Sequence, residues 1–358
     1  MKYRFIEFFS RANYVADTTV VIDINIQDVI SNISILYELV NADGTSCGHP
    51  AASITKVELV DGSDVLFSLD GAETEALDWY NKGGRFPANY NYALAGGNVQ
   101  RTLNLNFGRF LWDPELAFDP KQFNNPQLRI SLDINGGGNS CVSMYLTCYA
   151  NLFETQPAGL KGFLMAKEFK QWTMADNTHE YTDLPVDYPY RALYHRAALA
   201  GTESNQCVQN IKLSEDQDKR VPYNQAGNEI MRCVTNNYPF VEEAYFYAIA
   251  DSSKALYITP STLVTAQITQ WNAAAKAMGV AAWDGDGGRL YVDAITATGN
   301  TQINVTGHIP HSVFEIPFGL KNDINNWYDV RNIGNLKADI EGAAAAQGYL
   351  FAQQFRNY

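Results

Sequence analysis

Ile35-Leu36-Tyr37-Glu38-Leu39 recurs in altered form as Ala192-Leu193-Tyr194-His195-Arg196, at an offset of 193 − 36 = 157 residues. Four further matches follow in the same order along the chain. They pair Val57-Glu58-Leu59 with Ile211-Lys212-Leu213, Gly71-Ala72-Glu73 with Gly227-Asn228-Glu229, Phe107-Gly108 with Phe318-Gly319, and Asn125-Pro126-Gln127-Leu128 with Gly334-Asn335-Leu336. Each match is weak, but their shared order predicts that one structural unit occurs twice.

The stretches around these matches alternate between apolar and polar residues, which predicts strands with one buried face. They lie at residues 20–26, 33–39, 99–107 and 128–134, and Arg101 stands on the apolar side of the third. Glycine-rich turns separate them. Many short strands with frequent turns are typical of a β-sandwich.

Length and composition set limits on the class of protein. A chain of 358 residues suits two domains, and 46% hydrophobic with 13% aromatic residues indicates a globular fold. The net charge of −13, with only 26 Lys and Arg, argues against a surface that binds nucleic-acid phosphates. We place the boundary at the Pro/Gly connection around Pro157, giving domains 1–158 and 159–358.

A short helix is expected after each Gly-x-Glu. Glu73, Ala76, Leu77 and Tyr80 share one helical face before Gly83-Gly84, and a counterpart is expected at about residues 229–234.

The second copy is longer than the first. Glu229 to Phe318 spans 318 − 229 = 89 positions, against 107 − 73 = 34 for Glu73 to Phe107, so we predict an outward insertion at about 235–311. A helix is predicted there over Thr262–Met278, capped by Ser261 or Thr262 and ended by Gly279. Its apolar stripe consists of Val264, Ile268, Trp271, Ala275 and Met278.

The amino-terminal segment and the cysteines bear on partners and location. Lys2, Arg4 and Arg11 lie among aromatic residues, so this segment forms either the first strand or helix of its own domain or an arm that contacts a membrane or a neighbouring subunit. No secretory signal or apolar span is evident, which predicts a cytoplasmic protein. The cysteines have no zinc spacing and are expected to be buried free thiols: Cys47, Cys141, Cys148, Cys207 and Cys233.

Two segments resemble metal sites. Asp284-Gly285-Asp286-Gly287-Gly288 with Asp293 offers oxygens for calcium, but Gly288 and Ile295 stand where the calcium loop needs further ligands. A hairpin turn is the favoured interpretation. His308 and His311 flank Pro310 without an evident third ligand, which favours a loop.

No reactive constellation emerges from the other candidates. The pairs His179-Glu180 and Glu242-Glu243 suggest the paired carboxylates of a glycoside hydrolase. Acidic pairs that lie on solvated faces are commoner than catalytic pairs. No histidine adjoins a nucleophile motif, and Gly136-Gly137-Gly138 lacks the residues of a phosphate-binding loop. We therefore predict no catalytic residues, no cofactor and no metal, and so no enzyme.

Two stretches carry a resemblance to a known family. Residues 118–130, Phe118-Asp119-Pro120-Lys121-Gln122-Phe123-Asn124-Asn125-Pro126-Gln127-Leu128-Arg129-Ile130, are similar to the entry into a late strand of the first jelly roll in small bacteriophage members of the double jelly-roll major capsid proteins of the tectivirus–adenovirus lineage. Tyr188-Pro189-Tyr190-Arg191-Ala192-Leu193-Tyr194 resembles the entry to an early strand of their second jelly roll.

The resemblance implies an all-β chain of two consecutive eight-stranded jelly-roll sandwiches with short helices and a helical insertion in the second. It implies a homotrimer that forms pseudo-hexameric capsomers of an icosahedral virion. Neighbouring capsomers, penton proteins and minor capsid proteins would be its partners, with an internal membrane beneath the shell and assembly in the host cytoplasm.

Two alternatives of another class stay open. One is a two-domain jelly-roll protein that binds carbohydrate or hydrolyses glycosides, although the lack of a secretion signal counts against it. The other is a cupin-like enzyme, but the spacing of His179, His195, His308 and His311 does not supply a metal cluster.

Overall fold

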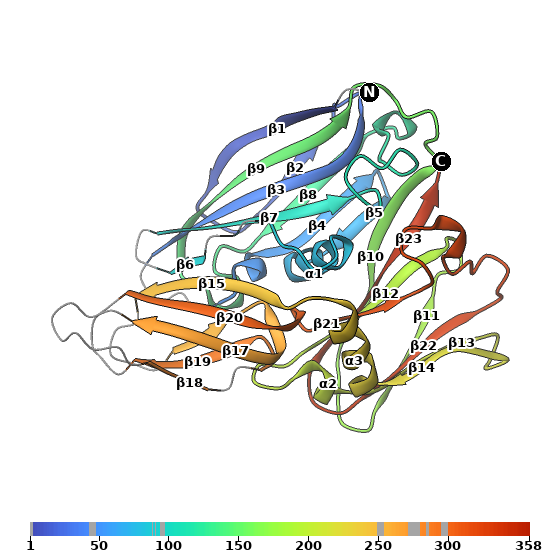
Figure 1. Ribbon diagram of the computed structural model, residues 1–358. Helices are drawn as coiled ribbons and strands as arrows, with labels where there is room; N and C mark the ends of the chain where they lie inside the picture. Colours follow the sequence, from blue (N-terminus) through green and yellow to red (C-terminus); the bar gives the residue numbers. More distant parts are fainter. Residues whose placement is uncertain are drawn as a thin grey trace.

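The computed structural model describes residues 3–42, 48–87, 89, 91–93, 97–248, 254–270, 280–283, 286–294 and 300–358 (Figure 1). The elements before residue 160 are β1 (Tyr3–Tyr14), β2 (Thr18–Asp23), β3 (Val29–Asn41), β4 (Ile54–Asp61), β5 (Asp64–Leu69), α1 (Gly71–Asn81), β6 (Asn91–Ala93), β7 (Asn98–Asn106), β8 (Pro126–Leu132) and β9 (Cys141–Phe153).

The later elements repeat this layout with additions. They are β10 (Gly162–Thr173), β11 (His179–Leu184), β12 (Tyr190–Ala198), α2 (Ser204–Cys207), β13 (Val208–Glu215), β14 (Arg220–Ala226), α3 (Gly227–Asn237), β15 (Val241–Ala248), β16 (Lys254–Tyr257), β17 (Pro260–Gln270), β18 (Val280–Trp283), β19 (Arg289–Ala294), β20 (Asn300–Pro310), β21 (Val313–Pro317), β22 (Leu336–Gly342) and β23 (Gln347–Asn357).

The strands form two jelly rolls with the same topology. In the first, sheet β1-β9-β3-β7 packs on β2-β8-β4-β5, and in the second, β10-β23-β12-β21 packs on β11-β22-β13-β14. The sequence matches fall on equivalent elements. Val57–Leu59 lies on β4 and Ile211–Leu213 on its counterpart β13, while the two Leu-Tyr pairs lie on β3 and β12. The double jelly-roll fold is thereby confirmed.

The two jelly rolls share a continuous sheet. Strands β5 and β10 pair in parallel, Phe67 with Ala166 and Ser68 with Lys167, which joins the inner sheets into one of eight strands. One buried apolar cluster extends through both jelly rolls. Sheet β1-β9-β3-β7 and sheet β11-β22-β13-β14 are consequently left on opposite flanks of the molecule (Figure 1).

Helix α1 closes one end of the first jelly roll. Asp70 accepts a hydrogen bond from the Glu73 N–H at 2.7 Å, and the Glu73 carboxylate accepts one from the Asp70 N–H at 3.0 Å, so the two residues form a capping box. The expected apolar face is buried, and the helix ends before Gly83 and Gly84, both at positive φ.

After α3, the described part of the insertion is built of strands, and the helix predicted over Thr262–Met278 is wrong for its first part. Residues 260–270 form β17, which pairs with β20 along Thr265↔Thr306 and Ile268↔Ile303. The positions Val264 and Ile268 fit a strand as well as a helix, and the surrounding β-branched residues favour pairing with β20. Trp271, Ala275 and Met278 lie outside the described residues.

The insertion also belongs to both jelly rolls rather than to the second alone. Its larger sheet has the order β17-β20-β15-β6, and β6 comes from the first jelly roll and pairs with β15 in parallel. A smaller sheet, β16-β19-β18, lies beside it (Figure 1). The amino-terminal segment is the edge strand β1, paired with β9. No helix among the described residues has the length and apolar character needed to span a membrane.

Candidate functional site

The first segment that resembled a metal site, Asp284 to Gly288 with Asp293, forms a turn before β19 where the structure describes it. Asp284 lies outside the described residues, whereas Asp286, Gly287 and Gly288 form a turn into β19, in which the Asp286 carbonyl accepts from the Arg289 N–H at 3.1 Å. The side chain of Asp293 is likewise outside what the structure describes. The described part of this segment is therefore an ordinary glycine turn.

His308 and His311 point to different neighbours. The His308 ring packs on Phe240, with centroids 4.5 Å apart, and burial lowers the pKa of His308. The His311 ring reaches α1 instead, where its Nε2 lies 2.8 Å from a carboxylate oxygen of Glu75. The two histidines thus do not act as a pair.

One of the two acidic pairs, Glu242 and Glu243, lines a pocket of about 310 Å³ together with Trp79 and Phe240. Glu180 forms an ion pair with Lys170, and the exposed His179 lies 2.8 Å from Asp339, which raises the pKa of the imidazole. Glu242 is exposed on β15, whereas the side chain of its neighbour Glu243 turns into the protein, as expected for successive residues of a strand.

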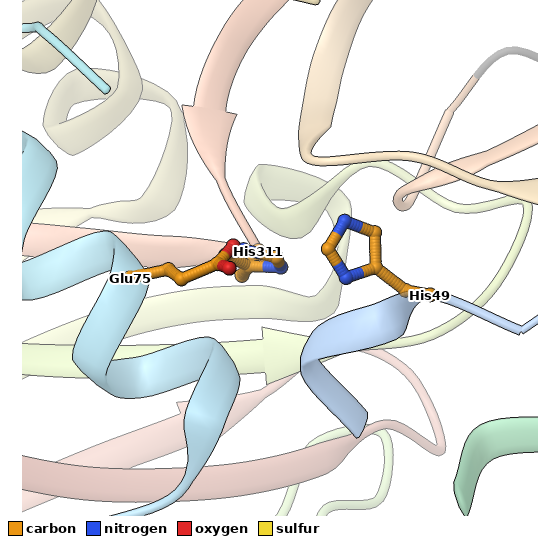
Figure 2. Close-up of side chains that lie close together, drawn as sticks. All are labelled: His49, Glu75 and His311. Atoms are coloured by element: carbon orange, nitrogen blue, oxygen red, sulfur yellow. Dashed lines mark hydrogen bonds and ion pairs between the residues drawn. The ribbon is translucent and has the colours of Figure 1, made fainter. Parts of the chain in front are cut away.

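Glu243 belongs to a buried ionic cluster that sequence analysis did not assemble. It consists of Glu75 from α1, Arg101 from β7, Glu243 from β15, His311 after β20, and His49 before the short 3₁₀ turn at Pro50–Ser53. Figure 2 shows Glu75, His49 and His311 converging from three separate segments. The ligand atoms of these three residues lie within 4.8 Å of one another.

Arg101 is the centre of the cluster and is fully buried. Its Nε and Nη2 donate to the two oxygens of Glu75, each at 2.7 Å, and Nη2 also lies 3.0 Å from Glu243. Burial by itself lowers the pKa of Arg101, but Glu75 and Glu243 reverse this and hold it above its usual value. Burial similarly acts to raise the pKa of Glu75, yet Arg101 and His311 hold it well below its usual range.

His49 is held as a neutral imidazole. Its Nδ1 accepts from the Ala51 N–H at 3.1 Å, so the proton sits on Nε2, which lies 3.0 Å from the Thr259 hydroxyl. Burial, followed by the charges of Arg101 and His311, lowers the pKa of His49 well below its ordinary value.

The residues present do not fit a metal ion. Both carboxylate oxygens of Glu75 already accept from Arg101, and both ring nitrogens of His49 are occupied. A divalent cation here would also lie beside a buried guanidinium. The cluster is instead a joint, because Arg101, Glu75 and His49 belong to the first jelly roll and Glu243, Thr259 and His311 to the insertion.

The sequence contains one signal for this cluster. Arg101 stands on the apolar side of its strand, and a buried arginine needs a carboxylate partner. Its partners could not be named, because Glu75, Glu243 and His311 are remote in sequence and meet only through the insertion fold.

Comparison with known proteins gives structural matches alone. No family model matches this sequence, and no curated protein is significantly similar to it. A solved structure of the Sulfolobus turreted icosahedral virus (STIV) MCP is 11% identical, with a TM-score of 0.62, over 99% of this chain and 97% of that chain.

Two further structures also match over nearly the whole of both chains. The major capsid protein P2 of bacteriophage PM2 is 13% identical, with a TM-score of 0.57, over 100% of this chain and 98% of that chain. VP54 of PBCV-1 is also 13% identical at a TM-score of 0.57, over 99% and 94% of the two chains. At such identities the matches establish the fold, and they do so across both jelly rolls and the insertion.

Proposed function

We propose that this chain, which has the double jelly-roll fold of these viral major capsid proteins, is itself a major capsid protein with a structural and not an enzymatic role. The observation that carries the proposal is the extent of the match, which leaves almost none of either chain unpaired. Glu180, Glu243, His179 and His308 are engaged in ion pairs or ring packing, which supports a structural role.

The proposed assembly is a homotrimer. The β5·β10 pairing joins the two sandwiches of each chain into one rigid pair. Three chains therefore contribute six sandwiches, which can fill a pseudo-hexagonal tile. The opposite flanks both expose aromatic side chains, with Phe5 on β1 61% exposed and Tyr181 on β11 57% exposed. Exposed aromatic residues favour flank-to-flank contact between neighbouring copies.

The remaining assignments follow from the same proposal. The jelly rolls correspond to residues 1–158 and 159–358, and the insertion of about 235–311 is a decoration on the shell. Neighbouring capsomers, penton proteins and minor capsid proteins are the partners within the virion, above an internal membrane, with assembly in the host cytoplasm. The net charge of −13 supports a shell that does not bind the genome directly.

Light scattering on the purified protein tests the assembly. The wild type should have three times the chain mass of 39.9 kDa, whereas Phe5→Glu and Tyr181→Glu should shift the mass toward one chain without loss of β-structure. Val15→Glu is the matched control, since Val15 is 69% exposed between β1 and β2. A folded wild-type monomer at micromolar concentration would contradict the proposal.

A further inference from the structure

A cavity of about 810 Å³ lies between the outer face of sheet β1-β9-β3-β7, the end of α1 and the segment after β21. No Asp or Glu lines it, although the chain as a whole is acidic. Its lining contains five cationic residues: Lys82, Arg85, Arg109, Arg191 and Lys321.

Three of these cations have carboxylate partners. Lys82 lies 2.8 Å from Asp78, Arg109 lies 2.7 Å from Asp113, and Lys321 lies 2.5 Å from Glu315. Arg85 is exposed and forms no ion pair with any described residue. The imbalance of charge therefore rests on Arg85 and on the buried Arg191.

Arg191 is 1% exposed and has only neutral acceptors. Its Nε donates to the Lys321 carbonyl at 3.1 Å, and its Nη1 donates to Asn81 Oδ1 at 2.6 Å and to Gln353 Oε1 at 2.7 Å. Its Nη2 has no acceptor among the described residues. A buried guanidinium without a carboxylate is costly, and the carboxyl end of α1 compensates it only in part.

Asn81 presents a second donor without an acceptor. Asn81 Oδ1 accepts from Arg191, which fixes the orientation of the amide, because a flipped amide would place its NH₂ group against the Arg191 donor. The buried Nδ2 of Asn81 has no hydrogen-bond partner. The two unsatisfied donors belong to adjoining side chains that line the same cavity, with Lys321 beside them. An acceptor that carries negative charge would satisfy both.

We propose that this cavity is a binding site for a small oxyanion, a phosphate or carboxylate group, held by Arg191 and Asn81. Arg85 adds positive charge to the same cavity and attracts the anion. The cavity is of the size of an ordinary small-molecule site, so it can hold an organic anion as well as an inorganic one.

Thermal unfolding in inorganic phosphate tests the site, with sodium chloride at matched ionic strength as the reference. Phosphate should raise the Tm of the wild type by a few degrees in a saturable manner. Arg191→Gln should weaken phosphate binding by about 10- to 100-fold. Arg331→Gln is its control, because Arg331 is exposed, is paired with Asp329 and lies outside the cavity.

Asn81→Asp provides a second test of the site that does not depend on the folding of Arg191→Gln. This variant supplies the missing carboxylate within the chain, so its Tm in chloride should rise and the response to phosphate should disappear. Asn177→Asp makes the same change at an exposed position and should keep the response. The site is refuted if phosphate stabilises the wild type no more than chloride does, or if Asn81→Asp retains the full response.

Discussion

Arg101 and Glu75 form a bidentate ion pair, with both N–O distances at 2.7 Å, that is buried where the first jelly roll meets the insertion. Charges taken out of water are tolerated only when they are paired and hydrogen-bonded, and here Glu243 and His311 complete the set. The pair therefore fixes the insertion on the sandwich by requiring one specific arrangement of α1, β7 and β15.

Replacing Arg101 with Met should destabilise the protein by about 3–5 kcal/mol, because two buried carboxylates lose their counter-charge. Urea unfolding measures the loss. Arg331→Met should change the unfolding free energy by less than about 1 kcal/mol, since the Arg331–Asp329 pair is exposed. Equal losses for the two variants would show that the buried pair has no special role.

The sequence predicted the jelly rolls better than the insertion. Periodic strands such as residues 33–39 bury one face locally, so their pattern is enough to identify them. The spacing of Val264 and Ile268 fits the period of a helix as well as that of a strand. Pairing with β20 makes this segment a strand. The ionic cluster and the basic cavity depend on contacts between remote segments, which no local pattern specifies.

Acid should destabilise the protein through buried neutral histidines. Burial lowers the pKa of His195 to about 4 from 6.5, so the unfolded chain binds the proton more tightly and stability is lost as the pH falls from 6.5 to 4. The loss from His195 amounts to about 3 kcal/mol. His49 acts in the same direction.

Unfolding free energies measured across this pH range check the contribution. His195→Phe should keep the stacking on Trp172, cost stability at pH 7 through the lost bond to the Tyr349 carbonyl, and flatten the acid dependence. His179→Gln is the control and should not flatten it, because His179 is exposed and its pKa is raised. An unchanged slope in His195→Phe would rule out the assignment.

Glu73→Gln should stabilise the protein at neutral and alkaline pH by roughly 1–2 kcal/mol. Burial, reinforced by Asp70 and Glu168, raises the pKa of Glu73 well above its usual value, so the native state loses stability as the pH rises through that pKa. Glutamine can still accept from the Asp70 N–H and preserve the capping box. Denaturation at pH 5 and pH 8 should show a gain confined to the higher pH.

Thiol reactivity should distinguish one cysteine from the others. Cys141, Cys148 and Cys207 are buried as predicted, and burial raises the pKa of Cys141 to about 11, whereas Cys233 is exposed and corrects the expectation of burial. In a Cys47→Ser background, a thiol reagent should modify one cysteine rapidly in the native protein and three more only after unfolding. Rapid loss of all four thiols would contradict the described packing.

Electron microscopy of the purified protein in negative stain tests the capsid assignment most directly. We expect uniform particles with a pseudo-hexagonal outline and threefold symmetry, as wide as a ring of six sandwiches. Particles of the size of a single chain, with no threefold averages at concentrations where the protein is folded, would contradict it.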